Sequence, residues 1–192
     1  MHLFPAYLVM FMQRWSVIEP ISSGEAAYIA IGSNLGESYE HLLFGVNNLS
    51  SIGRVIARSS IYQTVPVGGP QEQSCFLNAL VIVEPIGYFK GQPERILKVL
   101  LDIEHRRGRI RDTTWGPRTL DLDLICLGDL VANKTGLKVP HPRMMDRAFV
   151  LTPLCEVDSE WTHPITGDRA CEVLIKLDTS GVVRTELSWR KR

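Results

Sequence analysis

Asp121 and Asp123 are the residues whose types and spacing most directly suggest chemistry. They stand in the run Thr119–Leu124, where polar and apolar residues alternate strictly, and this period is typical of a half-buried β-strand. The leucines of the run should face a core, while both carboxylates project from the opposite face with Cα atoms roughly 6.5–7 Å apart. Carboxylate oxygens placed in this way can bind one hard cation, or two cations side by side.

Arginines accompany the two aspartates, with five of them against one aspartate between residues 105 and 118. Arg106 and Arg107 fall in the last turn of a predicted helix, where the helix dipole favours cations. That explanation does not reach Arg109 and Arg111, which lie beyond the glycine that should end this helix. Carboxylates beside guanidiniums are typical of a site for a metal–polyphosphate. The residues alone also permit a solvated strand face with surface ion pairs.

The composition describes an ordinary soluble globular protein. The chain has 192 residues, of which 45% are apolar, which favours a single domain. Its 21 basic and 21 acidic residues cancel, so no global field draws the chain to nucleic acid or to a membrane. The four cysteines lack metal-ligand spacing and should pack as small hydrophobes, which suits a reducing cytoplasm. We therefore expect a cytoplasmic monomer without nucleic-acid or membrane partners.

Three segments are expected along the chain: an N-terminal extension or linker at 1–26, the main domain at 27–157, and a C-terminal extension at 158–192 that packs on the domain or trails from it. Residues 3–12 are apolar, but this stretch is too short to span a bilayer. It has no basic segment before it and no small-residue cleavage site after it, so we do not interpret it as a signal peptide.

The pattern over residues 27–127 predicts the order β-α-β-β-α-β. The first helix should be capped by Ser38 and end at Gly53, and the second should begin at Pro93 and end at Gly108. Strands are predicted at 27–32, 55–65, 76–84 and around Asp121 and Asp123. This order is that of a ferredoxin-like α+β sandwich of two layers, here with C-terminal additions. Two helices would then cover one face of the sheet and leave the other face open for a ligand.

Three further residues could bind a ligand. Phe76 and Asn78 share one face of a predicted strand, where they could stack on a heterocycle and hydrogen-bond to it; a core phenylalanine beside an asparagine bonded to backbone is the simpler interpretation. His141 stands between two prolines, so its backbone should be extended and restricted. Its position leaves a structural and a functional role equally open.

Five segments of the sequence occur together in one protein family. They are, in order, Tyr28–Gly36 (YIAIGSNLG), Phe76–Ala79 (FLNA), Gly108–Arg111 (GRIR), Trp115–Asp123 (WGPRTLDLD) and Val139–Pro142 (VPHP). Together they make residues 27–157 resemble the 6-hydroxymethyl-7,8-dihydropterin pyrophosphokinases of folate biosynthesis. The resemblance implies a ferredoxin-like fold and the transfer of pyrophosphate from MgATP to the hydroxymethyl group of the pterin, with release of AMP.

The same resemblance implies roles on the nucleotide side. Asp121 and Asp123 would hold two Mg²⁺ ions that bridge the phosphates of ATP, the co-substrate. Arg109 and Arg118 would stabilise charge on the transferring group and on the AMP leaving group. The remaining nucleotide contacts would come from Glu104, Arg111, Trp115, Leu124, His141 and Arg147. The segment that carries Arg109 and Arg111 would close over both substrates and exclude water.

On the pterin side, the resemblance implies ring stacking and recognition of the ring edge. Phe76 and Phe149 would sandwich the heterocycle, and Asn78 would read its donors and acceptors. Mainly backbone groups would be offered by Thr64, Val65 and Val67.

Some positions depart from better-known members of the family. Phe76 replaces a tyrosine, which keeps the stacking but removes a hydroxyl. The segment between Arg111 and Trp115 is one residue shorter and carries Asp112, and Pro142 replaces a tyrosine. These departures concern the affinity for ATP and the kinetics of the loop, rather than the reaction.

Three alternatives compete with this interpretation. An RNA-binding module shares the β-α-β-β-α-β order but needs paired stacking aromatics and a basic sheet face, and two aspartates would repel phosphate without a metal. Another Mg²⁺-dependent nucleotidyl or phosphoryl transferase could use the same aspartates, and only the ordered motifs argue against it. An inactive member of the family is disfavoured because every required charged position is present.

Overall fold

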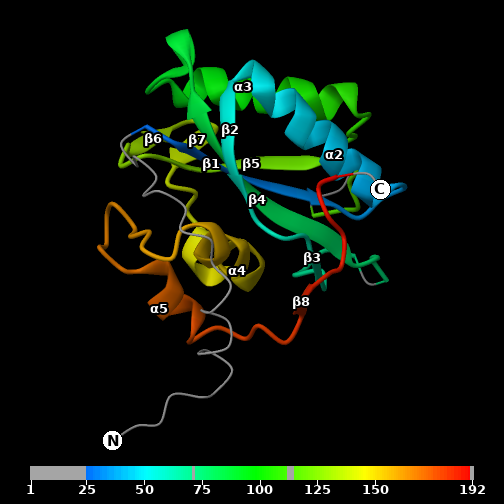
Figure 1. Ribbon diagram of the computed structural model, residues 1–192. Coiled ribbons are helices and arrows are strands. Elements are labelled where there is room, and N and C mark those ends of the chain that lie inside the picture. Colours follow the sequence, from blue (N-terminus) through cyan, green and yellow to red (C-terminus); the bar gives the residue numbers. More distant parts are fainter. Residues whose placement is uncertain (1–24, 71, 112–114, 191–192) are drawn as a thin grey trace, which may run out of the picture.

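An antiparallel sheet runs through the centre of the molecule (Figure 1). The computed structural model describes residues 25–70, 72–111 and 115–190. β1 (Ala27–Ser33) lies between β5 (Asp121–Leu127) and β4 (Phe76–Pro85). The other edge of β4 pairs with β2 (Gly53–Arg58) and with β3 (Tyr62–Thr64). The chain thus combines helices with an antiparallel sheet, which confirms the predicted mixed α/β composition of the fold.

The prediction of one continuous strand over 55–65 is wrong. The chain forms two strands there, β2 and β3, which are separated by the residues from Ser59 onward. The Ser59 hydroxyl accepts the backbone N–H of Leu80 (2.9 Å), so a side chain takes the place of a backbone partner there. The next N–H, that of Ser60, leaves the sheet altogether and donates to Glu156 Oε2 (2.8 Å). The split therefore depends on a residue almost a hundred positions away, which local periodicity cannot reveal.

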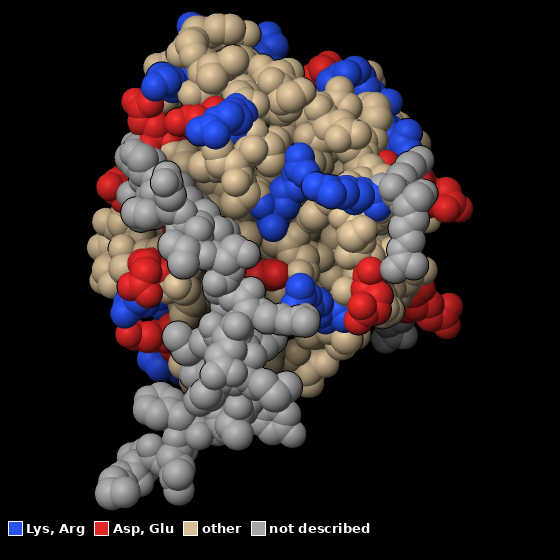
Figure 2. Space-filling model, in the orientation of Figure 1, with Lys and Arg blue, Asp and Glu red and all other residues tan. Residues whose placement is uncertain are grey.

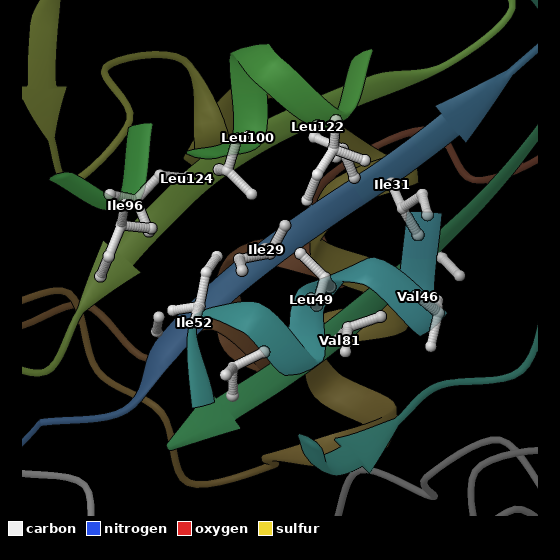
Figure 3. Close-up of a cluster of buried hydrophobic side chains, with 14 of the residues drawn as sticks. Ile29, Ile31, Val46, Leu49, Ile52, Val81, Ile96, Leu100, Leu122 and Leu124 are labelled. Carbon is white, nitrogen blue, oxygen red and sulfur yellow. The ribbon is translucent and has the colours of Figure 1, made fainter. Parts of the chain in front are cut away.

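Two helices cover one face of the sheet, α2 (Ser38–Asn48) and α3 (Pro93–Arg106). Figure 3 shows Ile29 and Ile31 of β1 pointing among side chains from these helices and from β5, and all of them are buried. Gly45 lets α2 approach closely, since a Cβ there would lie 2.6 Å from Ile31 Cδ1. This cluster fixes which face of β5 is turned inward.

The predicted limits of α2 need correction. Ser38 is the first helical residue rather than the cap, and Glu37 precedes it without a side-chain capping bond. After α2 a short 3₁₀ turn, η1 (Leu49–Ser51), follows, and Gly53 begins β2 instead of ending the helix. The limits of α3 are as predicted at its start, with Pro93 in the first turn, and Gly108 follows two residues after its end with φ of +74°.

The opposite face of the sheet is not left open, so the prediction of two layers with one free face is wrong. α4 (Ala148–Val157) packs on it, and Figure 1 shows this helix on the other side of the sheet from α2 and α3. Leu151 and Leu154 of α4 are buried with Tyr28, Leu80 and Ile82 of the sheet. The physical reason is that each large apolar side chain gains about 1.5–3 kcal/mol from burial, so these strands need a cover.

Shorter elements complete the chain. The hairpin of β6 (Ala132–Lys134) and β7 (Leu137–Val139) forms a second sheet. Beyond α4 come α5 (Ala170–Leu174) and β8 (Val182–Arg184), and β8 pairs with β3 at the sheet edge. The 3₁₀ turns η2 (Gly87–Phe89) and η3 (Met144–Asp146) precede α3 and α4.

The prediction that the cysteines pack as small hydrophobes has a mixed outcome. Cys126 is buried, as expected of a small hydrophobe, but Cys75 is exposed, so the packing prediction is wrong for that residue. Among the described residues, none of the helices has the length and apolar character that crossing a bilayer requires. Residues 1–24 and Asp112 lie outside the described residues, and the predictions for them stay predictions.

Candidate active site

β5 holds Asp121 and Asp123 on the same side of the sheet as α4, but outside the cluster that this helix buries. Their backbone partners on β1 are Gly32 and Ala30, and Gly32 in turn lies opposite Asn78 of β4. Paired residues of neighbouring strands point to the same side, so the two carboxylates and Asn78 share one face. The alternation predicted for this strand is confirmed, because the intervening leucines are buried in the cluster beneath α2 and α3.

Asp121 is the centre of an ion-pair network. Arg118 Nη1 donates to its Oδ2 (2.6 Å), and Arg109 Nη1 donates to its Oδ1. Arg109 also donates to Glu104 at the end of α3, and Arg111 donates to the second oxygen of Glu104. The positions of these arginines are therefore set by buried carboxylates rather than by the helix dipole.

Glu104 anchors this network to the sheet. Only 3% of its side chain is exposed, and its Oε1 accepts the backbone N–H of Leu122 (2.8 Å). Burial raises the pKa of this carboxyl, while the nearby Arg109 opposes the rise. Since both arginine pairs and the bond to Leu122 favour the ionised form, Glu104 serves to hold Arg109 and Arg111 against the start of β5.

Asp123 differs from Asp121 in having no such partner. Within the described parts of the chain its carboxylate makes no ion pair and accepts no hydrogen bond. Burial, and next the negative charge of Asp121, raise the pKa of Asp123 to about 6. Two carboxylates held this close repel each other, and a bound cation would relieve the repulsion.

A cleft of about 310 Å³ opens beside Asp123. It is lined by Leu97, Asp123, Leu124, Gly136, Leu137, Lys138, His141 and Pro142. Two residues expected on the nucleotide side, Leu124 and His141, thus line the same cleft as one predicted metal ligand. Glu104, expected in the same group, contacts Arg109 and Arg111 and does not line this cleft.

His141 is fixed at the side of this cleft. Its backbone N–H donates to the carbonyl of Ile125 on β5 (2.7 Å). Burial lowers the pKa of the imidazole to about 4, with the charges of Arg147 and Arg143 contributing in the same direction. The side chain is therefore neutral at pH 7 and can act as a hydrogen-bonding group rather than as a cation.

The residues expected on the pterin side begin on β4, where Asn78 lies across β1 from Asp121 on the same face. Asn78 Nδ2 donates to Thr64 Oγ1 (2.7 Å), and a Cβ on Gly32 would collide with Asn78 Oδ1. A glycine at position 32 is therefore what makes room for the Asn78 amide. The backbone N–H of Val65 donates to the carbonyl of Gly181 (3.0 Å), so its carbonyl is the backbone group that it could offer to a heterocycle.

The two aromatic rings expected to stack on the pterin both lie near guanidinium groups. Arg118 Cζ is 5.5 Å from the centre of the Phe76 ring, and Arg147 Cζ is 5.4 Å from that of Phe149. Val67 is 71% exposed on the neighbouring loop. Arg118 thus contacts both an aspartate and an aromatic ring, and it lies where the two sides of the site meet.

Two residues without a predicted role tie the surrounding loops together. Asn34, which is buried, accepts the backbone N–H of Arg118 (2.9 Å) and donates to the carbonyl of Ser74 (3.2 Å). Gln73 donates from Nε2 to the carbonyl of Trp115 (3.1 Å). The Gly-Ser-Asn turn that directly follows a buried strand is the signal that marks Asn34; nothing in the sequence singles out Gln73.

Comparisons with known proteins agree with this geometry. Residues 28–159 match the model of the family described as 7,8-dihydro-6-hydroxymethylpterin-pyrophosphokinase (HPPK). A 2-amino-4-hydroxy-6-hydroxymethyldihydropteridine pyrophosphokinase of Methylorubrum extorquens is 38% identical over 162 residues, which cover 83% of this chain and 98% of that protein. A protein with the same name from Bacillus subtilis is 41% identical over 133 residues, covering 68% of this chain and 77% of that protein.

Solved structures extend the likeness to the fold. The HPPK-DHPS protein of Plasmodium falciparum superposes with a TM-score of 0.61 over 79% of this chain at 15% identity. This chain spans only 44% of that longer chain, and at such low identity the likeness concerns the fold alone. The family model and the relatives, however, confirm the resemblance inferred from the ordered motifs: the chain belongs to the 7,8-dihydro-6-hydroxymethylpterin-pyrophosphokinase family.

Proposed function

We propose that this chain transfers pyrophosphate from MgATP to the hydroxymethyl group of 6-hydroxymethyl-7,8-dihydropterin, which gives the pterin diphosphate and AMP. Membership of the family makes the chain a pyrophosphokinase of folate biosynthesis. The observation that best supports the detailed reaction is one shared sheet face, on which Asp121 and Asp123 of β5 lie across β1 from Asn78 of β4. A site for a charged metal–phosphate and a site for a neutral ring would then be neighbours.

Asp121 and Asp123 are proposed to hold two Mg²⁺ ions. Mg²⁺ is usually bound by one or two carboxylates together with substrate phosphates and water. The two aspartates fit this mode of binding. Among the described residues, no group of three or more His, Cys, Asp or Glu side chains could hold a metal by itself, so the phosphates of ATP would complete the coordination shell. When bound, Mg²⁺ supplies charge neutralisation and alignment of the β-phosphorus with the attacking hydroxyl.

Arg109 and Arg118 are proposed to stabilise the charge that develops during transfer. Both guanidiniums now contact Asp121, so they lie within reach of any phosphate bound at that carboxylate. Fixed cations in a partly dry site act most strongly where charge develops. Arg111 follows Arg109 on the segment after α3, and we propose that this segment closes over both substrates and excludes water, which would otherwise hydrolyse ATP.

The remaining nucleotide contacts are proposed to come from the cleft beside Asp123. His141 and Leu124 line that cleft, and the charge of Arg147 acts on both aspartates. We place the adenosine against Leu124 and the phosphates toward Arg147. Trp115 borders this region through its loop, whereas Glu104 contributes by holding Arg109.

The pterin is proposed to bind over Asn78. The carboxamide would hydrogen-bond to the ring edge, with Thr64 fixing its orientation. Phe76 and Phe149 would stack on the two ring faces, a contact worth roughly 0.5–1.5 kcal/mol beyond area burial. The exposed loop of Val65 and Val67 would cover the outer edge.

The proposal also covers the type of fold, the domain limits and the partners of the protein. The strand order β5-β1-β4-β2, antiparallel throughout, supports a ferredoxin-like core with α4 added on its second face. We propose a catalytic domain at 27–157 between extensions at 1–26 and 158–192, in a cytoplasmic monomer. Both signs of charge are scattered over the face in Figure 2, which supports small-molecule substrates over a nucleic-acid partner.

One assay tests the reaction. The protein is incubated with MgATP and 6-hydroxymethyl-7,8-dihydropterin, and nucleotide products are separated by ion-exchange chromatography. We expect AMP in equal amount to the pterin diphosphate. Formation of ADP or of free pyrophosphate instead would identify another phosphoryl or nucleotidyl transferase, and absence of any product would identify an inactive member of the family.

A further inference from the structure

Arg143 is a cation at the candidate active site that has no assigned role. It follows His141 by two residues, and its backbone N–H donates to His141 Nδ1 (3.2 Å). The side chain is exposed, and in the described residues its guanidinium forms no ion pair with a carboxylate. Arg143 Cζ instead lies 5.4 Å from the centre of the Trp115 ring, within the range of a cation–π contact.

Trp115 is held firmly enough to position this guanidinium. Its backbone has a φ of +58°, which is uncommon for a bulky residue, and its carbonyl accepts a hydrogen bond from Gln73. A Cβ on Gly68 would lie 3.0 Å from Trp115 Cε3, so the loop of Gly68 packs on the ring as well. Arg143 therefore docks on a ring that other loops of the site already fix.

The charges around Arg143 do not balance. Its positive charge lowers the pKa of His141 and of Arg147, which shows that it acts on the same region as these residues. Among the described residues, five guanidiniums border the site, on Arg109, Arg111, Arg118, Arg143 and Arg147, against four carboxylates, on Glu104, Asp121, Asp123 and Asp146. Cations held together in excess favour a bound polyanion.

We propose that Arg143 is a further binding residue for ATP, which holds the triphosphate from the rim of the site while its guanidinium stacks on Trp115. This inference rests on the proposed function. The pterin substrate carries no charge that an arginine would recognise, so the triphosphate is the ligand of matching chemistry. A planar guanidinium can stack on an indole and bind phosphate at once, whereas a lysine ammonium binds phosphate without the stacking geometry. A charge at the exposed rim acts mainly on binding rather than on the transition state.

Steady-state kinetics of Arg143→Gln test this inference. We expect the KM for ATP to rise about tenfold, with kcat changed less than about twofold and the KM for the pterin unchanged. Arg143→Lys should recover part of the loss, since it keeps the charge. As the concentration of KCl increases, the KM for ATP should rise less steeply in Arg143→Gln than in the wild type. The reason is that the variant lacks one exposed charge contact that salt would screen.

The matched control is Arg54→Gln. Arg54 is an exposed arginine paired with Glu84, and that pair lies about 20 Å along β4 from Asn78. The kinetic constants of Arg54→Gln should equal those of the wild type. Trp115→Leu should raise the KM for ATP as well, and combining it with Arg143→Gln should cost less than the two single effects together, because the contact is shared.

Calorimetric titration with MgATP separates the possible outcomes. An unchanged dissociation constant for MgATP in Arg143→Gln would overturn the inference, and so would an equal rise in the KM of the pterin. If the wild type released no AMP, the proposed function would fail. The effect of Arg143→Gln on MgATP binding would still decide whether Arg143 is a nucleotide contact.

Discussion

The two sides of the candidate active site are built on different physical principles. The proposed nucleotide side is dense in charge, and Glu104 and Asp121 each bind two arginines there. The proposed pterin side is neutral, and its best-defined contact is the bond between Asn78 and Thr64. On the proposed function, one side would recognise its ligand by charge, and the other by shape and hydrogen-bond pattern.

The two sides of the site are also held in place differently. Charges on the nucleotide side must be held against mutual repulsion, so they are anchored to the ends of α3 and β5. The pterin side needs only space and one oriented amide, and Gly32 provides the space. Substitutions of Asp121, Asp123 and Arg109 should therefore mainly affect turnover, whereas substitutions at the exposed rim of the charged side or on the neutral side should mainly affect the affinity for one substrate.

The largest effect is expected from the aspartates. Asp121→Ala and Asp123→Ala should each lower kcat by at least about 10³-fold, because loss of a metal ligand removes several kcal/mol of charge stabilisation. Release of AMP measures turnover, and circular dichroism checks that the fold is intact. Asp129→Asn, an exposed aspartate just beyond β5, is the control. Wild-type rates in either alanine variant would refute the metal assignment.

A smaller effect is expected from Arg109. Arg109→Ala should lower kcat by about 10²-fold and change the KM for ATP only a few-fold, because its charge acts mainly in the transition state. Rapid-quench measurement of a single turnover would separate the chemical step from product release. Arg106→Ala, which removes an exposed arginine paired with Asp102, should leave both constants unchanged. A rise in KM with normal kcat would make Arg109 a simple binding residue.

Substitutions on the neutral side should change the KM of the pterin only. Asn78→Leu should raise the KM for the pterin about 10- to 100-fold, since the ring edge would lose its partner and stay desolvated. The affinity for MgATP, measured by calorimetry, should not change. Thr64→Val removes only the hydroxyl that Asn78 contacts and should give a weaker effect of the same kind. Equal losses for both substrates would show that the two sides are not independent.

The last expected effect concerns stability in acid rather than activity. The pKa of His141 is about 4 in the folded protein against 6.5 ordinarily, so between these values the unfolded chain binds more protons. Stability should therefore fall as the pH falls through this window, and remain constant in this respect above it. Urea unfolding from pH 7 to pH 4 should show a shallower loss in His141→Gln than in the wild type. His105→Gln, on the exposed end of α3, should behave as the wild type.

Local patterns carry much of this fold. The alternation around Asp121 and Asp123 predicts their common face, because successive residues of any strand point to opposite sides. The extent of α3 likewise follows from Pro93 and Gly108, whose backbone preferences act within one or two residues. Ordered motifs then sufficed to identify the family.

Other features could not be predicted because they depend on distant residues. α4 covers the second sheet face through contacts between Leu151 and residues such as Leu80, far earlier in the chain. Asn34 joins three loops that only the folded sheet brings together. Arg143 was missed because a single arginine after a proline has no distinctive pattern until Trp115 lies beside it.

Residue types and short spacings were enough to identify the family and to predict the face that Asp121 and Asp123 share. They also predict a metal-binding role for both carboxylates. The tertiary structure decided which partners those carboxylates have. Asp121 is bound by two arginines, whereas the half-buried Asp123 forms no ion pair with any described residue. The reason is physical: residues two apart on a strand have the same orientation, but the side chains that surround each of them come from other elements, and packing alone brings these together.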